Sequence, residues 1–165
     1  MAPANLGAPR AVAAVLVLLC LSLAAAQVTG CSGEPTQPEG DFLEIRGQRV
    51  TLEITRTREE QTRGLSHRQS LPWNHGMLFE YDSPGFPLFW MKDMHFDIDI
   101  VWIRDSRIVD ISPEVPHVPP GDPIPQVRPS QLTDTVLEIP AGYAAAHGWR
   151  PGDRVHLVRG RDARR

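Results

Sequence analysis

The densest set of chemically capable side chains lies in the middle of the chain, at residues 89–99, which read Phe-Trp-Met-Lys-Asp-Met-His-Phe-Asp-Ile-Asp. In a β-strand alternate residues share one face, so a strand here would gather His95, Asp97 and Asp99. Such a set could coordinate a hard or borderline divalent ion. It could equally be the polar start of a strand that runs into the core. We favour the second interpretation and predict no metal, because no side chains that would orient the ligands can be identified.

Charged residues inside otherwise apolar motifs form a second candidate site. Lys92 is the single lysine among 17 basic residues, and lysine differs from arginine in shape and hydration. A cleft lined by Arg68, Trp90 and Lys92, with Asp99 close by, would suit an anionic or sugar-like ligand. The cations would bind acid groups, and the indole would cover the face of a ring. Trp73 and His75 could form the lip of this cleft.

A structural interpretation of these charges competes with the ligand site. Buried charges persist only when they are paired, so Arg63 or Arg68 could form internal ion pairs with Glu138 or Asp99. We assign Arg63 and Glu138 to such pairs and keep the four residues named above as the ligand-binding prediction.

Motifs of catalysis are sparse in this sequence. It contains no Gly-x-Ser-x-Gly and no phosphate-binding glycine loop, and both cysteines, Cys20 and Cys31, precede the predicted domain. We therefore predict a non-catalytic ligand-binding or accessory module without a cofactor. The alternative is a hydrolase-like or metal-dependent enzyme that uses Asp99, Lys92 and His95.

Short strands separated by turn residues must position these side chains. We expect strands at residues 42–46, 49–54, 76–81, 87–92, 96–103, 107–111, 135–139 and 154–158. Thr57 and Glu60 fit the capping box of a helix that runs to about residue 64 or 67, and a second short helix is expected at 141–147. The pattern predicts a mainly β domain, a compact sandwich or small barrel with one or two short helices.

Seven of the 16 prolines lie between Pro113 and Pro129. This density excludes a central strand or a helix and predicts a long loop. The loop could be a stiff arm that docks a partner, which would make the chain a structural partner-docking domain. It could also be a strap over the edge of a sheet, and we prefer the strap.

Several short motifs, taken in order, resemble a known family. They are Arg63-Gly64-Leu65, Gly76-Met77-Leu78-Phe79, Phe89-Trp90-Met91-Lys92, Asp99-Ile100 and Val136-Leu137-Glu138. From about Val50 to Val158 the chain resembles the bacterial and archaeal family named domain of unknown function 192. The resemblance implies a compact, mainly β domain that is often exported and often anchored to a membrane. It implies no known reaction.

The first thirty residues differ from the rest of the chain. They carry one charge, Arg10, and an apolar run from Val12 to Leu23 that has the length of a signal-peptide core. The following Val28-Thr29-Gly30-Cys31 resembles the bacterial lipoprotein box, which implies lipidation of the Cys31 thiol and cleavage before it. An ordinary signal peptide cleaved near Ala26 and an uncleaved anchor are the alternatives.

These features predict four parts: a leader at 1–30, a linker at 31–41, one domain at 42–159 and a charged tail at 160–165. The net charge of −3 argues against a basic face for nucleic acid. We predict an exported lipoprotein of the cell membrane or outer membrane, with its domain outside the cytoplasm. Its predicted partners are the membrane, through the lipid on Cys31, and a small anionic or sugar-like ligand or an envelope protein.

Overall fold

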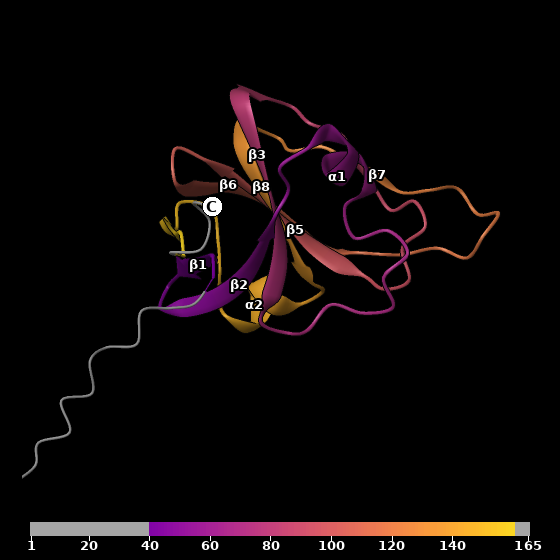
Figure 1. Cartoon of the computed structure of the whole chain (residues 1–165), viewed down its shortest axis with the longest axis horizontal. Helices are drawn as coiled ribbons and strands as arrows, with labels where there is room; N and C mark the ends of the chain where they lie inside the picture. Colours follow the sequence, from indigo (N-terminus) through magenta and orange to yellow (C-terminus); the bar gives the residue numbers. More distant parts are fainter. Residues whose placement is uncertain (1–39, 161–165) are drawn as a thin grey trace, which may run out of the picture. The chain divides into compact units, whose positions relative to one another are not determined.

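A computed structural model describes residues 40–160 of the chain (Figure 1). The strands are β1 (Phe42–Ile45), β2 (Gln48–Ile54), β3 (His75–Gly85), β4 (Phe89–Trp90), β5 (Ile98–Arg104), β6 (Arg107–Val115), β7 (Gln126–Val127), β8 (Thr133–Pro140) and β9 (Val155–Val158). The helices are α1 (Arg58–Arg63) and α2 (Tyr143–Ala146). The predicted leader, Cys31 and most of the predicted linker and tail lie outside the described residues.

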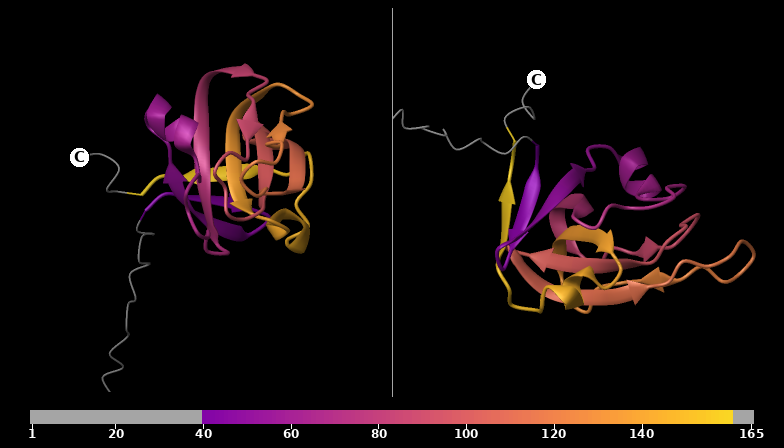
Figure 2. Two further views of the ribbon diagram at one scale, coloured as in Figure 1. Left: turned by 90° about the vertical axis from the view of Figure 1, so that its right-hand side faces the viewer. Right: turned by 90° about the horizontal axis from the view of Figure 1, so that it is seen from below.

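The strands confirm the mainly β prediction and form two sheets. The large sheet has the order β6-β5-β8-β3-β2-β1-β9, and β4 pairs with β7 in the small one. The large sheet curls into a half-barrel (Figure 2). An isolated bridge pairs Arg107 of the edge strand β6 with Arg154, the residue just before the other edge strand, β9. Within residues 40–160, no helix has the length and apolar character needed to cross a membrane.

The predicted hairpin at the start of the domain is confirmed. β1 and β2 pair antiparallel through a two-residue turn in which Arg46 and Gly47 both have positive φ, at 51° and 78°. Two residues of this kind match the twist of the flanking strands. β1 also pairs with β9, and the backbone N–H of Gly160 donates a hydrogen bond to Asp41. The two ends of the described chain therefore leave from the same corner.

The predicted capping box begins α1. The Thr57 hydroxyl accepts a hydrogen bond from the Glu60 N–H, and the Glu60 carboxylate accepts one from the Thr57 N–H. The helix ends at Gly64, whose φ is 52°. α1 lies in the connection between β2 and β3, which pair parallel, because parallel neighbours need a crossover rather than a tight turn.

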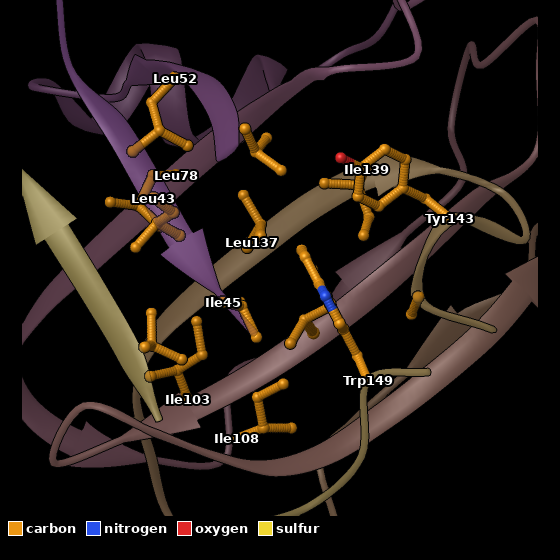
Figure 3. Close-up of a cluster of buried hydrophobic side chains, with 14 residues drawn as sticks. Leu43, Ile45, Leu52, Leu78, Ile103, Ile108, Leu137, Ile139, Tyr143 and Trp149 are labelled. Carbon is orange, nitrogen blue, oxygen red and sulfur yellow. The ribbon is translucent and has the colours of Figure 1, made fainter. Parts of the chain in front are cut away.

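The core lies on both faces of the large sheet, and strand alternation divides it. One face contributes Val101, Ile103, Leu137 and Ile139 to a cluster that includes Tyr143 and Trp149 (Figure 3). The opposite face contributes a second set of buried side chains: Ile98, Ile100, Trp102, Val136, Met77 and Phe79. Because Glu138 lies between Leu137 and Ile139, it points to this second face.

Some predicted boundaries were wrong. β5 begins at Ile98, so His95 and Asp97 precede the strand and do not share a strand face with Asp99. β3 continues past its expected end to Gly85, across a register irregularity after Glu80. β6 includes Pro113, which is tolerated there because β6 is an edge strand.

The proline-rich segment is also more ordered than predicted. β7 lies within it and pairs with β4, and the Met91 N–H donates a hydrogen bond to the carbonyl of Pro125. A long loop remains between β6 and β7, and it extends away from the sheet (Figure 1, orange).

Candidate functional site

A cavity of about 260 Å³ lies between α1, the loop after it and the second face of β3 and β8. Its apolar walls are Leu65, Phe79, Leu88, Phe89, Trp90 and Met94. Its titratable lining residues are Arg58, Arg63, Tyr81 and Glu138. The cavity thus combines aromatic surface with two cations and one acid.

Glu138 is the unusual group of this cavity. The residue is only 5% exposed, and its Oε2 atom is buried without a hydrogen-bond partner. Burial raises the pKa of the carboxyl group to about 8, against an opposing effect of the positive charge on Arg68. The carboxyl group is therefore mainly protonated at pH 7 and can donate a hydrogen bond.

The sheet register explains why Glu138 is buried. It lies opposite Met77 of β3 and opposite Ile100 of β5, so strands flank it on both sides. β3 approaches closely here because of Gly76: a Cβ atom at this position would lie 2.9 Å from the carbonyl oxygen of Glu138. Any larger residue at Gly76 would push β3 away from β8.

Tyr81 is a second proton donor in the cavity. Its ring is partly buried, and burial, followed by the negative charge that Glu138 carries when ionised, raises the pKa of the phenol to about 12. The hydroxyl consequently keeps its proton over the physiological range. Tyr81 was not among the predicted site residues, although strand alternation places it on the same face as Phe79 and could have identified it.

Two cations of α1 complete the lining. Arg58 and Arg63 are exposed, and among the ion pairs of residues 40–160 neither appears. Arg63 was predicted to pair with an acid such as Glu138. It lines the cavity with Glu138, without an ion pair between them, while Arg58 was not among the predicted site residues.

Arg68 lies beside the cavity rather than in it. Its guanidinium group donates two hydrogen bonds to the Glu53 carboxylate, at 2.5 and 2.7 Å, and this pairing lowers the pKa of Glu53. Glu53 lies opposite Met77, which lies opposite Glu138. Glu53 of β2, Met77 of β3 and Glu138 of β8 thus form one row across the sheet. Arg68 bonds to Glu53, which lies two strands away from Glu138.

Lys92 lines a different hollow, of about 630 Å³, with His95 and His117. The Lys92 side chain is exposed, and no ion pair within the described part of the chain includes it. Asp97 accepts hydrogen bonds from the backbone N–H of His117 at 2.8 Å and contacts its Nδ1 atom at 2.6 Å. The His117 contacts lower the pKa of Asp97, and they hold the start of the proline-rich loop.

Asp99 has a structural role. It is completely buried, and its oxygens accept backbone N–H groups of Glu114, Gly142 and Ala144 at 2.8–2.9 Å. These bonds tie β5 to β6 and to the start of α2.

The predicted residues therefore divide among several places. Trp90, Arg63 and Glu138 line one cavity, Arg68 lies next to it, and Lys92 and His95 share the second hollow. Asp99 is buried with both oxygens hydrogen-bonded, and it lines neither cavity. The three residues of the enzymatic alternative, Asp99, Lys92 and His95, therefore share no cavity. In the described range 40–160, no cluster of three His, Asp or Glu side chains could hold a metal ion.

Comparisons with known proteins agree with this fold. The family model DUF192, described as "Uncharacterized ACR", matches residues 42–157. A crystal structure of a protein of unknown function from Novosphingobium aromaticivorans DSM 12444 is 31% identical, with a TM-score of 0.63, and the match covers 70% of this chain and 83% of that chain. A Sinorhizobium meliloti 1021 protein described as a "putative transcription regulator" is 26% identical, with a TM-score of 0.61 and coverage of 71% and 91%. No curated protein matches the chain.

Proposed function

This chain belongs to the DUF192 family of uncharacterised proteins, and we propose that it is a lipid-anchored extracytoplasmic module that binds a small molecule in the Glu138 cavity. The observation that carries the proposal is the buried carboxyl oxygen without a partner. A buried polar atom left unsatisfied costs about 1–3 kcal/mol. A ligand that supplies the missing partner offsets that cost.

The walls and the volume of the cavity support a small ligand with a flat part. Its volume of about 260 Å³ is below the usual range of drug-sized sites, which starts at roughly 300 Å³. Trp90 is 43% exposed at the wall, so part of its indole is available to cover a ring. An anionic or sugar-like molecule of one ring fits these features.

The experiment is a thermal-shift screen of the full-length chain with benzoate, acetate, glucose and N-acetylglucosamine, followed by calorimetric titration of each probe that binds. Trp90→Ala should weaken binding about fivefold or more, because it removes the exposed aromatic wall. Trp73→Ala is the matched control, since Trp73 is 48% exposed and lies outside the cavity. Equal affinities in the two variants, or no binding of any probe, would refute a ligand site in this cavity.

The tether rests on the sequence alone, because Cys31 lies outside the described residues. The apolar leader followed by Val28-Thr29-Gly30-Cys31 supports lipidation of that thiol. Cys31→Ser should move the protein from the membrane to the soluble fraction and abolish acyl labelling. Cys20→Ser, within the leader, should change neither result. A Cys31→Ser protein that stays labelled and membrane-bound would disprove the anchor.

Nucleic acid is not among the proposed partners. The isoelectric point of about 6.0 and the net charge of −3 provide no excess of positive charge for phosphates. The description of the Sinorhizobium protein as a transcription regulator therefore does not extend to this proposal.

A further inference from the structure

The polar groups of the Glu138 cavity favour one of the two ligand classes. We infer that its ligand is the carboxylate of a small apolar acid, held by hydrogen bonds from the Glu138 carboxyl group and the Arg63 guanidinium group. The apolar part of this acid lies against Trp90. The inference rests on the proposed function, because it specifies the ligand of the same cavity.

The free polar groups of the cavity are mainly hydrogen-bond donors. Several polar side chains of the lining already donate to backbone carbonyls: Thr62 to Arg58 at 2.8 Å, Ser66 to Lys92 at 2.8 Å and Gln61 to Glu80 at 3.3 Å. The groups whose protons remain available are the guanidinium groups of Arg58 and Arg63, the Tyr81 hydroxyl, the Glu138 carboxyl and the Trp90 indole N–H. All five donate hydrogen bonds, and two of them are positively charged.

The charged side chains of the cavity favour an anion. Arg58 and Arg63 are its basic lining residues, and Glu138 is its single acid. Because Glu138 is protonated, no ionised carboxylate faces the ligand. Sugar hydroxyl groups donate as well as accept, so a sugar would leave several of its protons without a strong acceptor here. A carboxylate only accepts, which matches the set of donors.

A carboxylate ligand provides the hydrogen-bond partner that Glu138 lacks. The Glu138 carboxyl group lacks a hydrogen bond at Oε2, and a carboxylate accepts a short, charge-assisted bond from a protonated acid. Arg63 compensates the negative charge that enters the cavity, since a buried anion without a cation is costly. The aromatic walls bind the rest of the molecule.

Binding should depend on pH through Glu138. The charged and titratable groups around it are Tyr81 of β3, Arg58 and Arg63 of α1, and Arg68 in the loop after α1. Tyr81 keeps its proton between pH 6 and 9, because burial raises the pKa of its phenol to about 12. When Glu138 loses its proton it repels the ligand. Affinity should therefore be nearly constant between about pH 6 and 7 and fall about tenfold per pH unit above the Glu138 pKa.

The experiment compares benzoate with other probes that contain one ring, in the full-length chain. Benzoate should bind about tenfold or more tightly than benzamide, phenyl phosphate or methyl β-glucoside, because only benzoate offers a carboxylate to these donors. Arg63→Ala should weaken benzoate binding about tenfold, whereas Arg154→Ala, which removes an exposed arginine near β9, should leave it unchanged.

Glu138→Gln tests the role of Glu138 most directly. Glutamine keeps a neutral donor of the same shape, so benzoate affinity at pH 7 should stay within about threefold of the original value and no longer fall above pH 8. Glu138→Leu removes the donor and should abolish binding. An unchanged pH profile in Glu138→Gln would overturn the role assigned to this residue.

The outcomes separate the inference from the proposed function. If benzamide or methyl β-glucoside binds as tightly as benzoate and depends on Trp90, the carboxylate inference fails and the ligand site stands. If phenyl phosphate binds more tightly, the ligand is a phosphate ester and the inference also fails. If no probe binds in a manner that depends on Trp90, both fail.

Discussion

A methyl group on Gly64 would lie 3.6 Å from Oε2 of Glu138. The missing side chain at the end of α1 is thus one reason why the carboxyl group has no neighbour on that side. Gly64 also has a φ of 52°, which favours glycine. One residue therefore ends the helix and places no side chain against Oε2 of the buried acid.

Gly64→Ala should reduce both stability and binding. A residue with a Cβ atom at this backbone conformation costs roughly 1–3 kcal/mol, and the methyl group would cover the Glu138 carboxyl. Urea denaturation should show the loss in the free energy of unfolding, and calorimetry should show weaker benzoate binding. Gly85→Ala is the control, since a Cβ atom there would have nothing within 4 Å and the φ of Gly85 is not in the left-handed region. Equal effects of the two substitutions would contradict this account.

Glu138→Gln should change how stability depends on pH. Burial raises the pKa of Glu138 to about 8 in the folded protein from an ordinary value of 4.5. Its contribution to stability is therefore fully present below pH 4.5 and is lost as pH rises through about 8. The loss is about 1.4 kcal/mol per pH unit within that window. The stability of the Glu138→Gln protein should therefore increase relative to that of the original protein as pH rises.

The measurement is the free energy of unfolding by urea at pH 4.5, 6 and 8. The difference between Glu138→Gln and the original chain should be small at pH 4.5 and amount to a few kcal/mol at pH 8. Glu59→Gln, in the exposed first turn of α1, controls for the loss of one carboxyl group. A difference that does not grow with pH would show that Glu138 is ionised in the folded protein.

Asp99→Asn should destabilise the fold without any ligand present. The amide would turn one of the two acceptor oxygens into a donor that faces a backbone N–H, at a cost of roughly 2–3 kcal/mol. Guanidinium denaturation measures this loss. Asp82→Asn, at an exposed position of β3, should stay within about 0.5 kcal/mol of the original protein. If Asp99→Asn leaves the free energy of unfolding unchanged, the three N–H bonds contribute little to stability.

Lys92→Met should leave stability and benzoate binding nearly unchanged. The lysine side chain is exposed and lines a hollow separate from the Glu138 cavity, so its loss should alter the free energy of unfolding by about 0.5 kcal/mol or less. Thermal denaturation and titration with benzoate test both parts. A large loss of stability would reveal a buried ion pair of Lys92, and a loss of benzoate binding would place it in the ligand site.

The elements that depend on local chemistry could be predicted from the sequence. The capping box of Thr57 and Glu60 and the turn at Gly47 involve residues a few positions apart, so the sequence alone specifies them. The boundaries near His95 and Asp97 could not be predicted in this way. Asp97 bonds to His117, twenty residues later, and such a contact has no local signal.

The candidate site was predictable only in part. The alternation of side chains along residues 136–139 places Glu138 on the face of the sheet opposite to that of Leu137. The short motifs of the sequence indicated Trp90 and Arg63. Because buried charges are usually paired, Glu138 was expected to have an arginine partner. That partner is absent because Arg68 reaches Glu53 instead, an arrangement that depends on the parallel pairing of β2 and β3.

The pairing of β1 with β9 has a consequence for how the domain can be combined with others. Its two ends leave from one corner, with Gly160 bonded to Asp41, whereas the Glu138 cavity lies over β3 and β8. Domains with adjacent ends can be inserted into the loop of another protein without separating their strands. This domain could therefore be carried by a host chain at both ends while its cavity remains open.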